Sequence, residues 1–482
     1  MKRVYASLLI LLFTFACKKS KAQDEPIKNN TINSSLLIKD LDTLKHWITK
    51  AHGDPYRFTT PKNLNDQFEK ARQEVIRKQS ISGNEFAGIV MPIIAELRDG
   101  HAQVFLPNLN DIKGNLIFPV KYIFVNKKPY VIKNMSSEDI EIGSEILEIN
   151  GQNTSVFFNK IIPILHRDGD IETIRYRRLQ NQLYFTRVLM ALGKASKVYS
   201  IKYKNKKGQI LSSSLDGLSY TEYIESSAQK REKIKPMHYA KIDTLKNTAL
   251  LAIKSLNPGY YQKGEFYKQI DSIINTINRD MISNLIIDLR SNIGGEDSYI
   301  MYLLRYLLDK EFTVNSEITF RQNNYKFLPD GKHWDIAPNC FKKNEKGTYD
   351  ATEHLWEDHC TLGSFKPFDE RFKGRVVVLI NAFTFSAAAD LASMLYYKER
   401  AVFVGEETGG SSIGNVSGYI PTLDLPNSKV KVNLPLISLK NPYFSSKFNN
   451  HGVIPNYKVE PTVNSILSEK DEVLIKAISL IK

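Results

Sequence analysis

The chain has 482 residues, of which 66 are basic and 52 are acidic, so its formal net charge is +14 at pH 7. A basic balance can indicate binding to nucleic acid, but these lysines are scattered and form neither a basic helix nor a groove with interleaved aromatic residues. Nucleic acid is therefore not an expected partner, and the length predicts two or three domains.

The N-terminus has the composition of an export signal. Two basic residues precede an apolar stretch, residues 4–15, that is short for a transmembrane span. Ala16 stands directly before Cys17, as in a bacterial lipoprotein signal, where the cysteine becomes the lipidated first residue. We expect residues 1–17 to be such a signal and residues 18–35 to be a flexible tether. The expected location is the cell envelope, lipid-anchored to a membrane and facing the periplasm; ordinary secretion is the alternative.

The chain has three cysteines. If Cys17 carries lipid, Cys340 and Cys360 remain as a pair, and an oxidising compartment favours a disulfide between them. Two free buried thiols are the alternative. Both residues fall in a charged segment, residues 322–372, that we interpret as a long insertion. Its histidines and acidic residues match no zinc signature, so no metal is expected.

The first part of the mature chain is predicted to be helical. Apolar residues recur at helical spacing over residues 36–51 and 86–97, within a helical region that we place at 36–112. The second pattern ends at the Asp-Gly-His run 99–101, and an extended segment follows. A lone histidine such as His101 is more often a structural hydrogen-bonding group than a catalytic base, so this run alone decides nothing.

Residues 113–216 have the composition of a β-rich domain. Alternating apolar residues over 118–132 and 199–210 predict two hairpins, and residues 179–192 predict a helix. The strand and turn at 142–151 resemble a segment of PDZ domains, which bind the free carboxyl end of peptides by adding them as a strand to a sheet edge.

The C-terminal part, residues 246–482, follows a charged stretch at 217–245 that we interpret as a linker. Short apolar runs alternate with amphipathic helical patterns, which predicts an α/β layer structure. The predicted strands and helices are 249–253, 266–277, 285–287, 299–308, 401–405 and a last helix from about Glu469. Two adjacent glycines, Gly294 and Gly295, follow one of these strands and permit exposed N–H donors. No nucleotide-binding fingerprint is present.

A second motif lies in residues 375–400. The unbroken apolar run from Val376 to Ile380 predicts a strand that is buried on both faces. Small residues starting at Ala387 then open an amphipathic helix, which places Ser386 at the helix N-terminus. Backbone amides and the helix dipole favour an anion there. The alternative is that Ser386 is only an N-cap.

Six segments in this order resemble the S41 family of serine peptidases, which includes the tail-specific or carboxyl-terminal-processing proteases and the tricorn proteases. They are Asp99–His101, the PDZ-like segment, Asp288–Gly295, Thr384–Asp390, Gly405–Gly410 and Gly452–Pro455. The resemblance implies a multi-domain α/β protein with an N-terminal helical region, a PDZ-like β-rich domain and a ClpP/crotonase-like α/β catalytic core. It also implies that Ser386 is the nucleophile and that the amides of Gly294 or Gly295, with Ala387, form the oxyanion hole.

The resemblance also selects a catalytic base. The tail-specific branch has a lysine in a T-x-G-K-G run, but residues 408–412 read T-G-G-S-S here. The tricorn-like branch uses an upstream histidine, which His101 matches. That branch also has a glutamate before the G-V-x-P run, where this chain has Asn449 beside Asn450. Asn449 is therefore a possible orienting residue, although an asparagine cannot neutralise an imidazolium.

The predicted function is a serine-type endopeptidase that hydrolyses peptide bonds in protein tails or peptides, with neither a metal nor an organic cofactor. Its expected partners are protein or peptide substrates, bound by their C-terminal tails, and a membrane through the lipid anchor. The alternative is a non-proteolytic ligand-binding protein or a PDZ-type scaffold on the same fold. The presence of both Ser386 and His101 favours the enzyme.

Overall fold

The computed structural model describes residues 31–481, with gaps at 108–111, 113, 115, 228–234, 243–246, 323–324, 330–340, 344, 346–348, 352–361 and 443–449. Cys17, Cys340, Cys360 and Asn449 lie outside the described residues, so their lipidation, disulfide and orienting role stay predictions. None of the helices within the described ranges combines the length and apolar composition needed to cross a bilayer.

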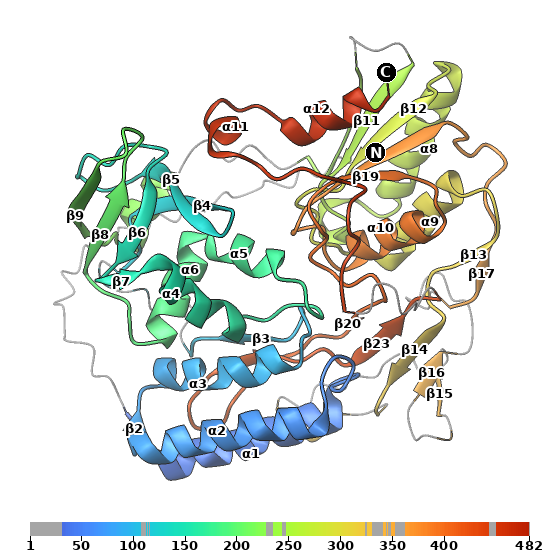
Figure 1. Ribbon diagram of the computed structural model, residues 1–482. Helices are drawn as coiled ribbons and strands as arrows, with labels where there is room; N and C mark the ends of the chain where they lie inside the picture. Colours follow the sequence, from blue (N-terminus) through green and yellow to red (C-terminus); the bar gives the residue numbers. More distant parts are fainter. Residues whose placement is uncertain are drawn as a thin grey trace, which may run out of the picture. The chain divides into compact units, whose positions relative to one another are not determined.

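A six-stranded sheet forms the centre of the C-terminal half (Figure 1). Its strands, in spatial order, are β10 (Met237–Lys241), β11 (Thr248–Ile253), β12 (Asn284–Asp288), β18 (Arg375–Ile380), β19 (Val402–Gly405) and β24 (Tyr457–Lys458). All neighbours are parallel except β10 and β11. The strands predicted in this half are thus confirmed, and the predicted linker ends in an additional edge strand, β10.

Helices cover both faces of this sheet. They are α8 (Glu265–Arg279), α9 (Asp297–Leu307), α10 (Ala387–Tyr397) and α12 (Glu472–Ser479). Val376, Val378 and Ile380 of β18 pack in one hydrophobic core with α8, α9 and α10, whereas Val377 and Leu379 pack toward α12. The unbroken apolar run is therefore explained, because successive side chains of β18 enter two different cores.

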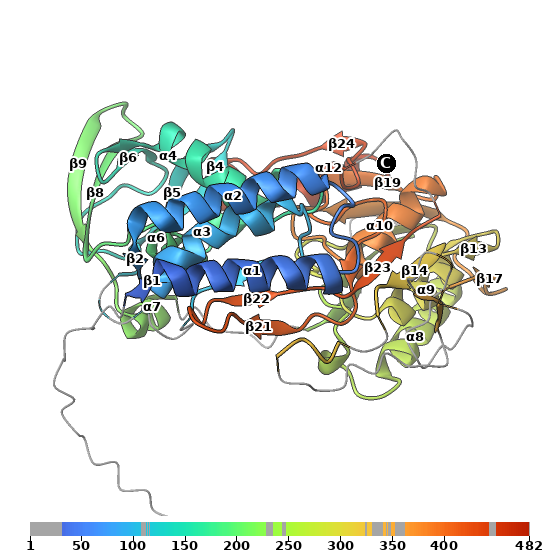
Figure 2. The ribbon, with the colours of Figure 1, turned by 90° about the horizontal axis from the view of Figure 1, so that it is seen from below.

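The N-terminal region contains α1 (Ser34–Ala51), α2 (Pro61–Lys78) and α3 (Gly83–Glu96), with a short strand pair β1 (Ile32–Asn33) and β2 (Ser80–Ile81). These helices pack on a hairpin from the distant end of the chain, β21 (Thr422–Asp424) and β22 (Lys431–Asn433), as Figure 2 shows. The third strand of that sheet is β3 (Gln103–Phe105), which pairs with β22. The buried carboxylate of Asp40 in α1 accepts the backbone amides of Asn427 and Ser428 and fixes the contact.

The β-rich region is an antiparallel sheet with helices on one side. Its elements are β4 (Val120–Val125), β5 (Lys128–Asn134), β6 (Glu145–Ile149), β7 (Gln152–Asn153), α4 (Thr154–Ile161), η1 (Ile162–Ile164), α5 (Thr173–Leu179), α6 (Gln182–Ala191), β8 (Val198–Lys204) and β9 (Ile210–Asp216). Both predicted hairpins are present. The helix predicted at 179–192 is wrong at its start, because α5 ends at Leu179 and Asn181 caps a new helix by accepting from the amide of Tyr184 (3.0 Å).

The remaining elements are a five-stranded sheet and several short helices and strands. A five-stranded sheet has the order β15 (Phe341–Lys343), β16 (Tyr349–Ala351), β14 (Glu317–Phe320), β23 (Ile437–Lys440), β20 (Val416–Ser417). Two strands of the predicted insertion thus extend a sheet of the C-terminal half. The short elements are α7 (Tyr220–Ser227), η2 (Pro258–Tyr260), β13 (Phe312–Thr313), β17 (Ser364–Phe365) and α11 (Val463–Leu467).

Candidate active site

Ser386 lies between β18 and α10, at the first turn of the helix. Its backbone has φ 53° and ψ −134°, a left-handed conformation that costs a residue other than glycine about 1–3 kcal/mol. Its side chain makes no capping hydrogen bond to α10. An ordinary N-cap serine has an extended backbone and accepts a hydrogen bond from the helix. The interpretation of Ser386 as only a cap therefore does not fit the structure.

The turn before Ser386 is held by buried hydrogen bonds. Thr384 is fully buried, and its hydroxyl donates to the carbonyl of Leu289 (3.0 Å) and accepts the amide of Asn381 (3.1 Å). The amide of Phe385 donates to the carbonyl of Asn292 (3.0 Å). These contacts tie the turn to the loop after β12, so the strained conformation of Ser386 is imposed by its surroundings.

Two glycines make room for this strained serine. A Cβ atom on Gly294 would lie 2.7 Å from the Cβ of Ser386, and one on Gly410 would lie 3.0 Å from the Ser386 nitrogen. The first of these also has φ 97°, which other residues rarely adopt. Both positions therefore require glycine, which explains why glycines occur at positions 294 and 410 of the motifs around the candidate nucleophile.

The structure favours one pair of amides as the donors of the expected oxyanion hole. The N–H of Gly294 donates to the side-chain oxygen of Asn292 (2.9 Å), so it is already engaged. Within the described residues, the amides of Gly295 and Ala387 donate to no acceptor. Gly295 lines the same cavity as Ser386, and Ala387 begins α10. We therefore assign the candidate oxyanion donors to Gly295 and Ala387.

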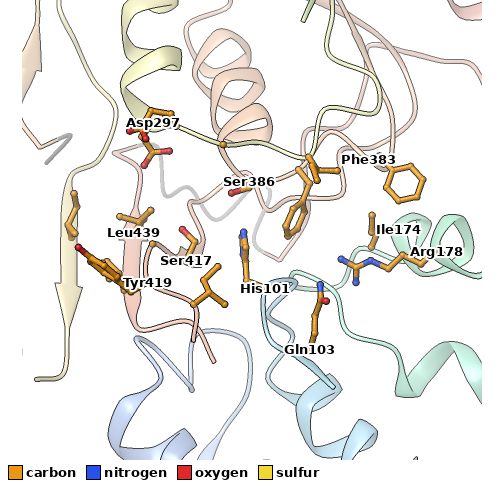
Figure 3. A pocket seen from close by; sticks show the side chains of 18 residues that line it. His101, Gln103, Ile174, Arg178, Asp297, Phe383, Ser386, Ser417, Tyr419 and Leu439 are labelled. Carbon is orange, nitrogen blue, oxygen red and sulfur yellow. The ribbon is translucent and has the colours of Figure 1, made fainter. Parts of the chain in front are cut away.

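His101 is brought to Ser386 by three separate segments. After α3 the chain turns at Arg98 (φ 53°) and then enters β3, which is paired with β22. The amide of Gly100 donates to Asp168 Oδ1 (2.6 Å), and the imidazole packs on Phe385 with ring centres 4.6 Å apart. Figure 3 shows the imidazole directed at the hydroxyl of Ser386.

A buried carboxylate stands behind this imidazole. His101 Nδ1 is buried without a hydrogen-bond partner, and Asp99 Oδ1 lies 3.7 Å from it. The same oxygen accepts the backbone amide of His101 (2.8 Å), while Oδ2 contacts Nε2 of the buried His52 at 2.8 Å. His52 Nδ1 accepts the amide of Asp54 (3.2 Å), so the neutral ring carries its proton on Nε2 and donates it to Asp99.

The ionisation of Asp99 follows from these contacts. Burial alone would raise the pKa of its carboxyl, but the interactions with His101 and His52 outweigh that effect and hold the pKa well below its usual range. Asp99 is thus a buried carboxylate that stays ionised at neutral pH. It therefore places a negative charge beside the imidazole of His101.

A second buried carboxylate, Asp168, links the histidine loop to the glycine-rich turn. Its Oδ1 accepts the amide of Gly100 and its Oδ2 accepts the amide of Ser411 (3.1 Å). Burial raises the pKa of this carboxyl, and the charge of His101 opposes that rise. Ligand atoms of Asp99, His101 and Asp168 lie within 4.8 Å of one another. All four carboxylate oxygens already have a hydrogen-bonding partner, which suits an orienting network better than a cation site.

Sequence reasoning missed both carboxylates as functional candidates. Asp99 had a signal, because it stands two residues before His101 in the motif. Asp168 had none, since it lies in a polar loop without periodicity and far from the motifs. The described neighbour of Asn449, Asn450, contacts Asp170 instead, whose amide donates to the Asn450 carbonyl (2.6 Å).

Ser386 and His101 line one cavity of about 660 Å³. On one side of this pair the wall is formed by Tyr419 and Leu439 and ends near Asp297; on the other side lie Ile174, Phe383 and Arg178 (Figure 3). The wall is mostly apolar, as is usual for sites that bind peptides or small molecules. Lys398 is at the opposite end of α10 and does not line this cavity.

These features together are suited to acyl transfer, since a hydroxyl, an imidazole and two unengaged amides converge in one mostly apolar cavity. The class of protein that they define is a serine hydrolase. Residues 247–459, a little under half of the chain, match the model of peptidase family S41, a family of serine peptidases. The matched segment includes Ser386, Gly295 and Ala387, whereas Asp99 and His101 lie outside it.

The chain is also similar to solved structures over nearly its whole length. Mature CPAF in complex with lactacystin has 16% sequence identity, with 93% of this chain and 98% of that chain covered and a TM-score of 0.65. A second structure of mature CPAF has 16% identity, with 92% and 96% covered and a TM-score of 0.59. At this identity the likeness shows a shared fold, which includes the regions before residue 247.

Proposed function

We propose that this serine peptidase is an endopeptidase in which Ser386 attacks the peptide carbonyl and His101 is the general base. The observation that carries the proposal is the strained backbone of Ser386, held opposite the imidazole of His101 across one cavity. Strain in a residue other than glycine persists only where the surrounding structure imposes it, and it is concentrated at functional sites.

In the proposed reaction the neutral imidazole takes the proton of the Ser386 hydroxyl as its oxygen attacks. The amides of Gly295 and Ala387 bind the resulting oxyanion, and protonated His101 gives its proton to the leaving amine. Water then attacks the acyl-enzyme in the same manner and releases the second product. No step needs groups other than these side chains, amides and water.

Asp99 is proposed as the residue that orients His101, in the place of the glutamate that the tricorn-like branch has. The distance of 3.7 Å between Asp99 Oδ1 and His101 Nδ1 is longer than a hydrogen bond. Catalytic hydrogen bonds are often long in the absence of substrate and shorten when it binds. An ionised carboxylate there would fix the tautomer of His101 and stabilise the imidazolium.

The test of the proposed nucleophile is Ser386→Ala, measured for both peptide hydrolysis and melting temperature. Hydrolysis should fall by several orders of magnitude, to the roughly 10³- to 10⁴-fold rate enhancement that binding and an oxyanion hole alone supply. The matched control is Ser393→Ala, which removes a buried hydroxyl from the same helix that donates only to the carbonyl of Ala389. Retained hydrolysis in Ser386→Ala would refute the proposal.

The substrate class and location are also proposals. Tails of proteins are the proposed substrates, with the PDZ-like region at 113–216 as the proposed site for their carboxyl ends. Lipidation of Cys17 and a periplasmic location rest on the signal-like sequence at the N-terminus. Metabolic labelling with an alkyne palmitate should modify the wild type and leave Cys17→Ser unmodified; labelling of neither would favour secretion.

A further inference from the structure

One of the three arginines of α5 has no acidic ion-pair partner among the described residues. Arg175 faces Glu172 at 3.7 Å, and Arg177 forms an ion pair with Glu406. Arg178, by contrast, takes part in none of the ion pairs among the described residues. The two donors that it uses point to carbonyl groups: Nη1 to His166 (2.7 Å) and Nη2, weakly, to Gly100 (3.5 Å).

The unpaired guanidinium faces the active-site cavity. Arg178 lines the same cavity as Ser386 and His101, and Figure 3 shows its guanidinium directed into it from the side opposite Asp297. Its central carbon lies 6.0 Å from the ring centre of Phe385, the residue next to Ser386. A guanidinium has five N–H donors in a planar fork, so donors remain for a further acceptor.

A cation in this environment is a strong site for an anion. Burial lowers the pKa of Arg178 and so disfavours its charged form, and the longer-range attractions of Tyr184 and Asp168 oppose this shift. A partly desolvated charge without an ion-pair partner is costly, and an incoming carboxylate can form two parallel hydrogen bonds with it. The apolar neighbours Ile174 and Phe383 would strengthen such a pair by keeping water away.

The position of Arg178 relative to the catalytic pair indicates which part of a substrate it meets. Its Nη2 contacts the carbonyl of Gly100, the residue before His101, so it lies on the histidine side of Ser386. The histidine gives its proton to the leaving amine in the proposed reaction. The segment that follows the scissile bond would therefore extend toward Arg178.

We infer that Arg178 is a specificity residue that binds a carboxylate in the substrate segment after the scissile bond. This carboxylate is either the side chain of an aspartate or glutamate or the free α-carboxyl group of a nearby chain end. The inference rests on the proposed function, because it uses the roles given to Ser386 and His101.

The test begins with an equimolar mixture of synthetic peptides, whose cleavage sites in the presence of the full-length protein are read by mass spectrometry. A cleaved peptide is then synthesised with an aspartate or an asparagine after the scissile bond, each with a free or an amidated C-terminus. The wild type should cleave at least one carboxylate version with kcat/KM on the order of 10- to 100-fold above its neutral partner. The version that shows the preference identifies the source of the carboxylate.

Substitutions then separate recognition from a structural role. Arg178→Gln should abolish the preference, and Arg178→Glu should reverse it toward a peptide with lysine at that position. Arg175→Gln removes a charge from the same helix outside the cavity and should keep the preference. Complete labelling of each variant by a fluorophosphonate shows that the site is folded.

Each outcome decides between the two proposals. Equal cleavage of charged and neutral peptides by the wild type, or a preference that survives Arg178→Gln, would overturn the role of Arg178 while leaving the peptidase proposal intact. Failure of the wild type both to cleave any peptide and to react with the fluorophosphonate would refute the proposed function, and this inference with it.

Discussion

Ser386 and His101 face the same cavity, but the chain positions them in different ways. Ser386 is held by backbone geometry, since β18, its buried turn and two glycines force one conformation. His101 is held by side chains, because Asp99, His52 and Asp168 form a buried polar network behind it. The serine side thus belongs to one compact layer structure, whereas the histidine side is assembled from segments that are far apart in sequence.

This difference has a consequence for mutations. Geometry that is imposed mainly by the packed backbone depends on few polar side chains, whereas a buried polar network depends on every member. We therefore expect substitutions on the histidine side to change activity in graded steps and to alter its pH dependence. Substitutions on the serine side should change activity only where they touch the hydroxyl, the buried hydrogen bonds of Thr384 or the close-packed glycines.

The largest effect on the histidine side is expected for His101 itself. His101→Ala should lower kcat/KM by about 10⁴- to 10⁶-fold, because the hydroxyl loses its base. In the wild type kcat/KM should rise with pH and then level off, since only the neutral imidazole accepts a proton, and the variant should lack this rise. Lys398→Ala is the control and should keep both the rate and the pH profile. Wild-type hydrolysis by His101→Ala would mean that another residue is the base.

A smaller loss of activity than in His101→Ala is expected when Asp99, the proposed orienting carboxylate, is replaced. Asp99→Asn keeps the size of the side chain and removes its charge, so kcat/KM should fall by about 10²- to 10⁴-fold with KM little changed. His52→Asn disturbs the same network without touching His101 and should cost less. Should Asp99→Asn retain full activity, the orienting role would pass to another group, with Asp168 as the next candidate.

The pH dependence of acid stability should show the same carboxylate. The pKa of Asp99 is lower in the folded protein than in the unfolded chain. Its contribution to stability is therefore present at pH values above its pKa in the unfolded chain, and it is lost as pH falls through its pKa in the folded protein. The melting temperature of the wild type should therefore drop more steeply below about pH 4 than that of Asp99→Asn. Parallel curves would contradict the assignment of an ionised Asp99.

The smallest predicted effect concerns Asp390 in the first turn of α10, on the serine side. Burial, followed by the nearby charge of Asp297, raises its pKa well above the usual range. The protonated carboxyl contributes fully to stability at pH values below its pKa in the unfolded chain. This contribution is lost as pH rises through its pKa in the folded protein. Asparagine cannot ionise, so the free energy of unfolding of Asp390→Asn should increase relative to that of the wild type as pH rises. The difference should be on the order of 1 kcal/mol for each unit by which folding raises the pKa of Asp390. A stability difference that does not change with pH would contradict this.

The sequence predicted the serine side better than the histidine side, for a physical reason. The apolar run of β18 and the small residues that open α10 are local patterns, and each fixes its own element. The role of His101 came from a resemblance, since its neighbours in space are remote in sequence. Asp168 could not be predicted, because its partners are 68 and 243 positions away. The choice of Gly295 over Gly294 depends on one hydrogen bond to Asn292, which leaves no sequence pattern.

The break between α5 and α6 is a further example. Apolar residues continue through Leu179 to Leu192, but the side chain of Asn181 accepts the amide of Tyr184 and starts a new helix. This local capping bond overrides the periodic pattern. It also matters for function, because Arg178 stands at the end of α5, where the break leaves it facing the cavity.

Reaction with a fluorophosphonate probe tests most directly whether Ser386 is a nucleophile activated by His101. The purified wild type should incorporate one probe molecule, and mass spectrometry of its peptides should place the label on Ser386. Labelling should be absent in Ser386→Ala, strongly slowed in His101→Ala and unchanged in Ser393→Ala. A folded wild type that does not react, or a label on a different residue, would contradict the nucleophilic role of Ser386.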